Sequence, residues 1–373
     1  MVAMSGGVDS TVAAAVLARE GHHVVGVTMR LWGGESDTGC CSVADVDDAR
    51  RVADQLGIDH HVFNFTEDFG RHVVDPYVAA HVAGTTPNPC VECNRRIKFD
   101  RLAERAAQLG FDAVATGHHA RIEALGGRWA LRRSADRAKD QSYVVHMLGQ
   151  PELARTLFPI GGFPDKASVR RAAADLGLRT AGKPDSQDVC FITSTGGRAE
   201  FLRRRTAVHQ ARVIDTAGHA VGRVDAVELV TLGQRKGLGL AGGGPKRYVV
   251  GVDRSSGTVT VGGEHDLLTE ELRVGRTTWV DGRFGGEVLV QCAAHGATQP
   301  ARLRLGDGDG AVVEWRHPQR AVAPGQSVVF YDPTDRYVLG GGVADATVNR
   351  RRLASASTAP GRVGETSSAS NET

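Results

Sequence analysis

The segment Ala3-Met4-Ser5-Gly6-Gly7-Val8-Asp9-Ser10-Thr11, which continues into the alanine-rich residues 12–18, decides the fold of this chain. Apolar residues give way to two glycines, then to an aspartate and two hydroxyl residues, and finally to residues of high helix propensity. This order is typical of a strand, a tight loop and a helix. Because Gly6 and Gly7 have no Cβ, the loop can turn sharply and leave amide groups facing an anion. We therefore expect a phosphate-binding loop here.

The spacing within this loop does not match two common nucleotide motifs. No lysine follows the glycines as the P-loop requires, and the pattern G-x-G-x-x-G is absent. Residues 5–10 instead resemble S-G-G-x-D-S, the pyrophosphate loop of ATP pyrophosphatases, which split ATP into AMP and pyrophosphate. An ordinary glycine-rich turn capped by Asp9 is the alternative interpretation.

Length, charge and cysteine content limit the class of protein. The 373 residues, of which 41% are hydrophobic, can bury more than one core, so two or three domains are expected. A formal net charge of only +2 means that a nucleic acid would have to bind a local basic patch. No window approaches the roughly 20 apolar residues of a membrane span. We expect the N-terminal residues to form part of the first domain and not a signal peptide. We therefore expect a cytoplasmic protein without a membrane partner, whose six cysteines are thiols and not a disulfide framework.

Strand and helix patterns alternate after the first loop. Residues 24–29 and 61–65 read as strands, and residues 45–56 and 69–81 have helical spacing. This alternation predicts a doubly wound parallel sheet, in which ligands bind at the carboxyl ends of the strands. Met29 ends the second strand and is therefore a candidate adenine contact, although a lone methionine is more often part of a core.

A stiff loop with a thiol follows the second helical segment. The prolines of Pro87-Asn88-Pro89 enforce an extended loop, and Cys93-Asn94 then opens a basic helix. A thiol at a helix N-terminus near cations is favoured as the thiolate. These features make Cys93 a candidate nucleophile.

Two other interpretations of these cysteines remain open. Cys40, Cys41, Cys90 and Cys93 could supply four thiolates to zinc, and Cys90 and Cys93 could form a redox dithiol. Adjacent cysteines cannot easily point at one tetrahedral metal, and the prolines disfavour a thioredoxin-like motif. We therefore expect no metal site.

Three later segments also carry polar or thiol groups. Residues 113–116 form a strand that ends in Gly117-His118, where His118 could donate to a phosphate. Lys139-Asp140-Gln141 is a compact cluster of polar side chains. Cys190 lies between an acidic, amide-rich loop and an apolar stretch that reads as a strand, so its residue context alone leaves a core role and a chemical role equally open.

Six segments in this order resemble the tRNA-specific 2-thiouridylase family over almost the whole chain up to about residue 350. The segments are Ser5-Gly6-Gly7-Val8-Asp9-Ser10, Pro87-Asn88-Pro89 with Cys93-Asn94, Ala115-Thr116-Gly117-His118, Lys139-Asp140-Gln141-Ser142-Tyr143, Asp185-Ser186-Gln187-Asp188-Val189-Cys190-Phe191-Ile192 and Thr231-Leu232-Gly233-Gln234-Arg235-Lys236-Gly237-Leu238-Gly239. Six ordered matches are far more specific than any single one.

The resemblance implies a reaction and a set of site residues. It implies that ATP, with Mg²⁺, adenylates O2 of the tRNA wobble uridine, and that persulfide sulfur from a sulfur-donor protein then replaces this oxygen. It implies that Cys190 carries the persulfide and that Cys93 is the nucleophilic or resolving thiol. The remaining implied residues bind ATP (Ala3, Met4, Ser5, Gly6, Gly7, Val8, Asp9, Ser10, Met29, Gly117), face the target base (Asn88, Pro89, Cys90) or contact tRNA (His118, Lys139, Asp140, Gln141, Arg235, Lys236, Gln326).

The chain departs from the family pattern at two sets of residues, and its first strand is also short, starting only a few residues before Ser5. Many members have an aspartate, suggested as an acid or base at the uridine, where this chain has Cys90. An Arg-Tyr pair on the tRNA-binding barrel falls near Ala293 and Ala294 here, so that contact is not carried over.

The organisation changes beyond about residue 200, where short alternating strands and glycine-rich turns begin. Arg235 and Lys236 lie between glycines and suit an RNA backbone or an ordinary solvated turn. We expect an ATP pyrophosphatase domain of the adenine nucleotide alpha hydrolase type over 1–197, a linking domain over 198–267, a small β-barrel over 268–352 and a disordered tail over 353–373. The alternatives to a thiouridylase are another ATP pyrophosphatase, such as an amide-forming ligase, and a non-catalytic zinc-bound RNA-binding module.

Overall fold

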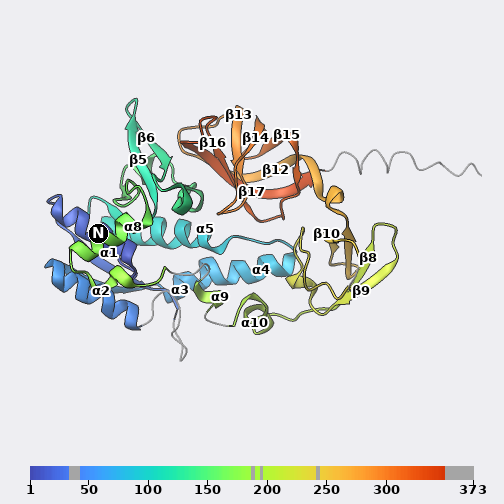
Figure 1. Ribbon diagram of the computed structural model, residues 1–373, viewed down its shortest axis with the longest axis horizontal. Helices are drawn as coiled ribbons and strands as arrows, with labels where there is room; N and C mark the ends of the chain where they lie inside the picture. Colours follow the sequence, from blue (N-terminus) through green and yellow to red (C-terminus); the bar gives the residue numbers. More distant parts are fainter. Residues whose placement is uncertain (33–42, 186–189, 194–195, 241–243, 349–373) are drawn as a thin grey trace, which may run out of the picture.

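The computed structural model describes residues 1–32, 43–185, 190–193, 196–240 and 244–348. Within these residues the chain forms a parallel-sheet domain, a small four-stranded sheet and a closed six-stranded barrel (Figure 1). The predicted fold class is therefore confirmed. Among the described helices, none is long and apolar enough to cross a membrane.

The parallel sheet has the order β3-β2-β1-β4-β7. Its strands are β1 (Val2–Ala3), β2 (Val25–Arg30), β3 (Asp59–Asn64), β4 (Val114–Thr116) and β7 (Thr156–Leu157). All four neighbouring pairs are parallel. The strands that follow β1 are added on one side of it as β2 and β3, and then on its other side as β4 and β7. The carboxyl ends of β1 and β4 therefore form the switch point where such sheets bind ligands.

Helices cover both faces of this sheet. One face carries α1 (Val8–Arg19), α2 (Val43–Leu56) and α8 (Lys166–Asp175), which share a core cluster. Ala13, Ala14 and Ala15 of α1 are completely buried, and their small side chains let the helix approach the sheet closely. The opposite face carries a second cluster, which includes residues of α4 (Asp75–Ala83), α6 (Leu102–Gln108) and α10 (Arg198–Arg203).

The predicted helix over 69–81 is confirmed and is longer than expected. It comprises α3 (Thr66–Phe69), a π-helical segment (Gly70–Val74) and α4, and it ends at Gly84, whose φ of +97° suits glycine. A second helical run follows as α5 (Pro89–Cys93), a π-helical segment (Asn94–Arg101) and α6.

The prediction that Cys93-Asn94 opens this helix is wrong. The Asn88 side chain accepts hydrogen bonds from the backbone N–H groups of Cys90 and Val91, and Pro89 occupies the first turn. The helix therefore begins at Pro89 and places Cys93 one turn inside it. The helix dipole consequently acts more strongly on Cys90 than on Cys93.

A hairpin absent from the sequence prediction lies after β4. It consists of β5 (Ala120–Leu125) and β6 (Arg128–Arg133) and leads into two 3-10 turns, Arg137–Lys139 and Ser142–Val145. An isolated bridge joins Arg132 of this hairpin to Tyr337 of the barrel domain. A shared core cluster also includes Leu131, Tyr143 and Val329, so the hairpin and the barrel pack as one unit.

The remaining short elements lie before β7 and after α8. α7 (Gln150–Leu153) precedes β7, whereas the 3-10 turn Arg179–Gly182 and α9 (Cys190–Thr193) lead from α8 toward the linking sheet. The strand expected after Cys190 is wrong, because a helical turn stands there. The linking sheet has the order β10-β11-β8-β9 and contains β8 (Ala211–Asp215), β9 (Ala220–Val224), β10 (Tyr248–Asp253) and β11 (Thr258–Gly262), with the 3-10 turns Val227–Leu229 and Glu264–Leu267 after β9 and β11.

The barrel closes in the order β12-β15-β14-β13-β16-β17. Its strands are β12 (Leu268–Trp279), β13 (Gly286–Gln291), β14 (Gln299–Leu305), β15 (Ala311–Arg320), β16 (Ser327–Tyr331) and β17 (Val338–Val348). The first five contain the segments whose residues alternate as in strands, namely 272–274, 288–290, 301–305, 311–313 and 327–331. The closing strand β17 was not predicted because three consecutive glycines, 340–342, interrupt its strand pattern. The expected tail over 353–373 lies outside the described residues.

Candidate nucleotide and thiol site

The loop between β1 and α1 has the geometry of an anion cradle. Gly7 is the N-cap of α1 and no side chain caps this helix, so its first amide groups point from the loop without an intrahelical partner. Gly6 has a φ of +70°, and a Cβ at this position would collide with the carbonyl of Asp45. The Ser10 hydroxyl accepts a hydrogen bond from the Ser5 N–H at 3.1 Å and donates to the Gly7 carbonyl at 3.1 Å. These groups fit a pyrophosphate.

The carboxyl end of β4 lies directly against this loop. A Cβ at Gly117 would lie 2.7 Å from the backbone nitrogen of Ser10, so only glycine permits this approach. Met29, at the end of β2, is 9% exposed and belongs to the sheet core. Its contact with adenine stays a prediction.

Asp9 is held by two residues from distant parts of the chain. Lys166 at the start of α8 donates to both carboxylate oxygens of Asp9 at 2.6 Å, and His119 Nε2 lies 3.2 Å from one of them. Burial raises the pKa of Asp9, but the hydrogen bonds from His119 and Lys166 outweigh it and hold this pKa below its ordinary value. Asp9 is therefore a carboxylate at neutral pH.

Asp185 forms a second node of the same network. Its carboxylate lies 2.9 Å from Lys139 Nζ, 3.1 Å from Lys166 Nζ and 2.8 Å from the Arg170 guanidinium. Burial opposes ionisation, yet hydrogen bonds from Lys139 and Lys166 lower the pKa of Asp185 to about 2. Lys139, which is 44% exposed, was expected to contact tRNA, and that contact stays a prediction.

Lys183 forms a third connection to the loop. Its ammonium donates to the Gly6 carbonyl at 3.0 Å and lies 2.6 Å from Asp45 and 2.8 Å from Asp48 of α2. Burial lowers the pKa of Lys183, but these two carboxylates raise it above its usual value. Lys166, Lys183 and His119 were not among the predicted site residues. Two features of the sequence could have identified these residues. Lys166 begins a helical segment, and His119 and Lys183 lie beside the segments that contain His118 and Asp185.

Cys93 lies half-buried against the core on the other side of the sheet. It packs against a cluster that contains Phe69, Tyr77 and Phe191, and Phe191 follows Cys190 in the sequence. The structure thus brings the neighbour of Cys190 into the cluster that contacts Cys93. The side chain of Cys190 lies outside the described residues, so the pairing of the two thiols stays a prediction.

The zinc hypothesis also involves residues that the structure does not describe, namely Cys40 and Cys41. Within the described ranges, no group of three or more histidine, cysteine or carboxylate side chains is arranged to hold a metal.

The expected target-base loop is tied to the barrel. The Thr86 N–H donates to the Pro324 carbonyl at 2.7 Å, and the Gln326 side-chain amide donates to the Thr86 carbonyl. Asn88 uses its side-chain oxygen to cap α5. Gln326 therefore supports the loop that carries Asn88, Pro89 and Cys90. Contacts of all four residues with tRNA stay predictions.

Three residues that were expected to contact tRNA have internal partners. His118 is 7% exposed and shares a hydrogen bond of 2.7 Å with Thr116, and burial lowers its pKa far below the usual range. The Asp140 carboxylate binds the guanidinium of Arg133 at 2.6 Å, and Gln141 accepts from the His119 N–H at 2.9 Å. Their tRNA contacts stay predictions, as do those of the exposed Arg235 and Lys236.

Three family models match successive parts of the chain. Residues 1–194 match the tRNA methyl transferase HUP domain, residues 199–263 the tRNA methyl transferase PRC-barrel domain and residues 269–344 the aminomethyltransferase beta-barrel domain. The first model alone spans more than half of the chain.

Curated relatives match over nearly their full length. The protein "tRNA-specific 2-thiouridylase MnmA" of Roseiflexus sp. (strain RS-1) is 45% identical over 92% of this chain and 98% of its own length. The protein of the same name from Mycolicibacterium gilvum is 47% identical over 93% of this chain and 99% of its own. Among solved structures, NMN synthetase from Francisella tularensis is 17% identical, with a TM-score of 0.29 over 55% of this chain and 76% of that chain, a likeness that supports no conclusion.

Proposed function

The chain belongs to the tRNA-specific 2-thiouridylase family, and from this premise we propose how its own residues carry out the reaction. The protein is an enzyme, an ATP-using sulfurtransferase that modifies tRNA. The observation that carries the residue assignment is the uncapped start of α1 in the Ser5–Ser10 loop, with Asp9 and Lys166 beside it.

ATP supplies the activation of uridine O2, which is a poor leaving group until it becomes an ester of AMP. The amides at the start of α1, including that of Ser10, and the Ser5 hydroxyl bind its phosphates, and Gly117 leaves room beside them. Asp9 is the carboxylate that fits Mg²⁺, because this ion is commonly held by one or two carboxylates together with substrate phosphates. Lys166 and Lys183 offset the negative charge around the loop.

The two thiols deliver sulfur in a step whose atoms balance. A sulfur-donor protein places a persulfide on Cys190, and the Cys93 thiolate attacks the inner sulfur of that persulfide. Hydrosulfide leaves, a disulfide forms between Cys93 and Cys190, and hydrosulfide adds to C2 of the uridine as AMP leaves. An external dithiol then reduces the disulfide. Asn88, Pro89 and Cys90 face the base, and Cys90 supplies a thiol there. We place the reaction in the cytoplasm.

A nucleoside measurement tests the proposal. Mass spectrometry of tRNA from cells lacking this protein should show loss of 2-thiouridine at the wobble position, and the native gene should restore it. Purified protein should release pyrophosphate from ATP only when tRNA is present. Restored 2-thiouridine by a Gly7→Val variant that folds normally would contradict the assignment of the loop, because a Val side chain obstructs the anion cradle.

A further inference from the structure

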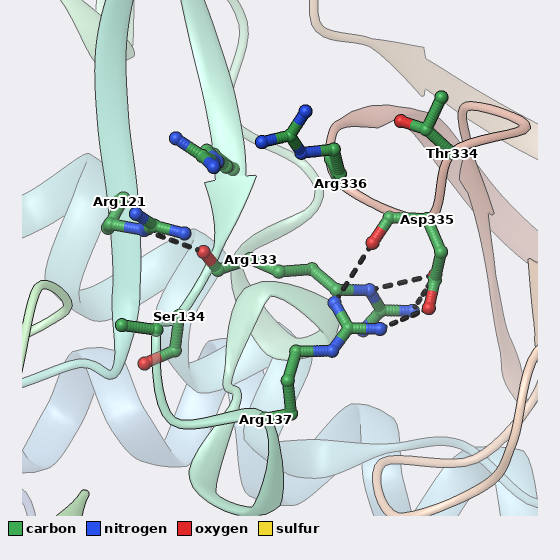
Figure 2. A pocket seen from close by; sticks show the side chains of 9 residues that line it. Arg121, Arg133, Ser134, Arg137, Thr334, Asp335 and Arg336 are labelled. Atoms are coloured by element: carbon green, nitrogen blue, oxygen red, sulfur yellow. Dashed lines mark hydrogen bonds and ion pairs between the residues drawn. The ribbon is translucent and has the colours of Figure 1, made fainter. Parts of the chain in front are cut away.

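An arginine-lined cavity lies between the β5–β6 hairpin and the loop that precedes β17. Its volume is about 460 Å³, and Figure 2 shows side chains from the hairpin and from the barrel domain facing one another across it. The five arginines that line it are Arg121, Arg132, Arg133, Arg137 and Arg336.

The walls of this cavity are fixed by contacts between the two domains. The Arg133 guanidinium binds the Asp335 carboxylate at 2.8 Å, and Arg137 pairs with the same carboxylate (Figure 2). The Arg133 N–H donates to the Arg336 carbonyl at 3.0 Å, and Arg121 Nε donates to the Arg133 carbonyl at 2.9 Å. The arrangement is therefore built before a ligand arrives.

Positive charge remains after the internal ion pairs are formed. Arg133 and Arg137 are balanced by Asp140 and Asp335, and Arg132 pairs with Glu123. Arg121 only reaches the same Glu123 at 4.0 Å. Within the described part of the chain, no carboxylate pairs with the exposed Arg336 guanidinium, which Figure 2 shows without an interaction to the residues drawn. Burial and, to a smaller extent, the charge of the neighbouring Arg132 lower the pKa of Arg121.

We infer that this cavity, whose lining contains none of the proposed ATP, base or thiol residues, binds a backbone phosphate of the tRNA substrate. The inference rests on the proposed function, because tRNA is the polyanion that this enzyme modifies. Guanidinium groups bind phosphate oxygens in bidentate fashion, and a chain with a net charge of only +2 needs such a local patch to hold RNA. Because the hairpin belongs to the ATP-binding domain and Arg336 to the barrel domain, one phosphate here contacts both domains.

A phosphate contact predicts a particular dependence on salt and sequence. Replacing one arginine that binds a phosphate removes about one unit from the slope of log affinity against log salt concentration. Phosphates carry no base information, so the loss should be the same for a tRNA with the target uridine and for a tRNA without it.

The experiment measures the Kd of the full-length protein for full-length tRNA by filter binding, at several salt concentrations. Arg336→Gln should weaken binding by about tenfold at low salt and reduce the salt slope by about one. Arg336→Lys, which keeps the charge, should retain most of the slope. The control is Arg302→Gln, because Arg302 is exposed on β14 and does not line the cavity; its affinity should equal that of the native protein.

The outcomes separate this inference from the proposed function. If the native protein binds tRNA and Arg336→Gln binds it with equal affinity and slope, the phosphate site is wrong and the thiouridylase assignment stands. If the native protein binds no tRNA, both are wrong. If calorimetry detects inorganic phosphate in the cavity of the native protein while Arg336→Gln leaves tRNA affinity unchanged, the site holds a free anion and the inference is overturned.

Discussion

The ammonium group of Lys166 lies 2.6 Å from both carboxylate oxygens of Asp9. The same ammonium group lies 3.1 Å from the carboxylate of Asp185, and Asp185 begins the segment that leads to Cys190. Lys166 is only 13% exposed, so its charge is weakly screened by water. One lysine therefore joins the nucleotide loop to the beginning of the proposed persulfide segment, and it reduces the negative charge where the phosphates of ATP must enter.

Removal of this lysine should impair ATP use rather than tRNA binding. Lys166→Met removes the cation that Asp9 and Asp185 share beside the phosphate site, and we expect tRNA-dependent pyrophosphate release to fall by about 100-fold. Most of the fall should be in kcat/KM for ATP, with the Kd for tRNA unchanged. The matched control is Arg171→Gln, on the exposed face of the same helix, which should behave as the native protein. Equal loss in both variants would contradict the role given to Lys166.

The two proposed thiol roles predict different defects. Cys190→Ser should abolish persulfide formation and thiolation but keep tRNA-dependent pyrophosphate release, whereas Cys93→Ser should accept a persulfide and fail to turn over. Mild oxidation of the native enzyme should join Cys93 to Cys190, which requires their Cα atoms to approach within about 7 Å. Peptide mapping by mass spectrometry checks this pairing. A bond between Cys90 and Cys93, with an active Cys190→Ser enzyme, would restore the dithiol interpretation.

Asn88 should have separable effects on stability and on the reaction. Its side chain caps α5 through the N–H groups of Cys90 and Val91, so Asn88→Ala should lower the free energy of unfolding by about 1 kcal/mol. Asn88→Ser keeps a capping oxygen and should restore most of this stability. If Asn88 also faces the target base, Asn88→Ser should still have a reduced kcat/KM for tRNA. Urea unfolding measures the effect on stability, and single-turnover thiolation measures the effect on the reaction. Full activity of Asn88→Ser would show that Asn88 only caps the helix and does not contact the base.

Buried histidines should make the protein sensitive to mild acid. His146 is 1% exposed, its Nδ1 lies 2.8 Å from the Tyr143 carbonyl, and burial lowers its pKa to about 4. In the unfolded chain this histidine takes up a proton near pH 6.5, whereas in the folded chain it does not. The free energy of unfolding therefore has its full value above pH 6.5 and declines as the pH falls toward 4. Each such histidine should contribute a slope of about 1.4 kcal/mol per pH unit in this window.

Urea unfolding between pH 7.5 and 4.5 checks this slope. His146→Gln removes the titrating group and should flatten the decline, even if the variant is less stable at every pH. His22→Gln is the control, because the His22 side chain is 56% exposed. An unchanged slope in His146→Gln would show that other groups dominate the acid response.

The sequence by itself determined the nucleotide loop and the class of fold. The Gly6-Gly7 turn followed by an alanine-rich helix is a local pattern, and the alternation of strands and helices then predicts a doubly wound parallel sheet. Five barrel strands were also readable from local alternation. The start of α5 was misjudged because the two prolines were taken to enforce an extended loop, whereas Asn88 caps the helix and Pro89 occupies its first turn.

Only the tertiary structure decided which distant charges meet. Lys166 is 157 residues from Asp9 and His119 is 110 residues from it, and neither spacing leaves a periodic signal in the sequence. The same holds for the arginine cavity, whose walls come from a hairpin and from a barrel loop about 200 residues apart. Helix and strand patterns report which face of an element is buried, but they do not report which element covers it. That choice follows from sheet order and from the packing of whole domains, and it is what turns isolated lysines and arginines into a site.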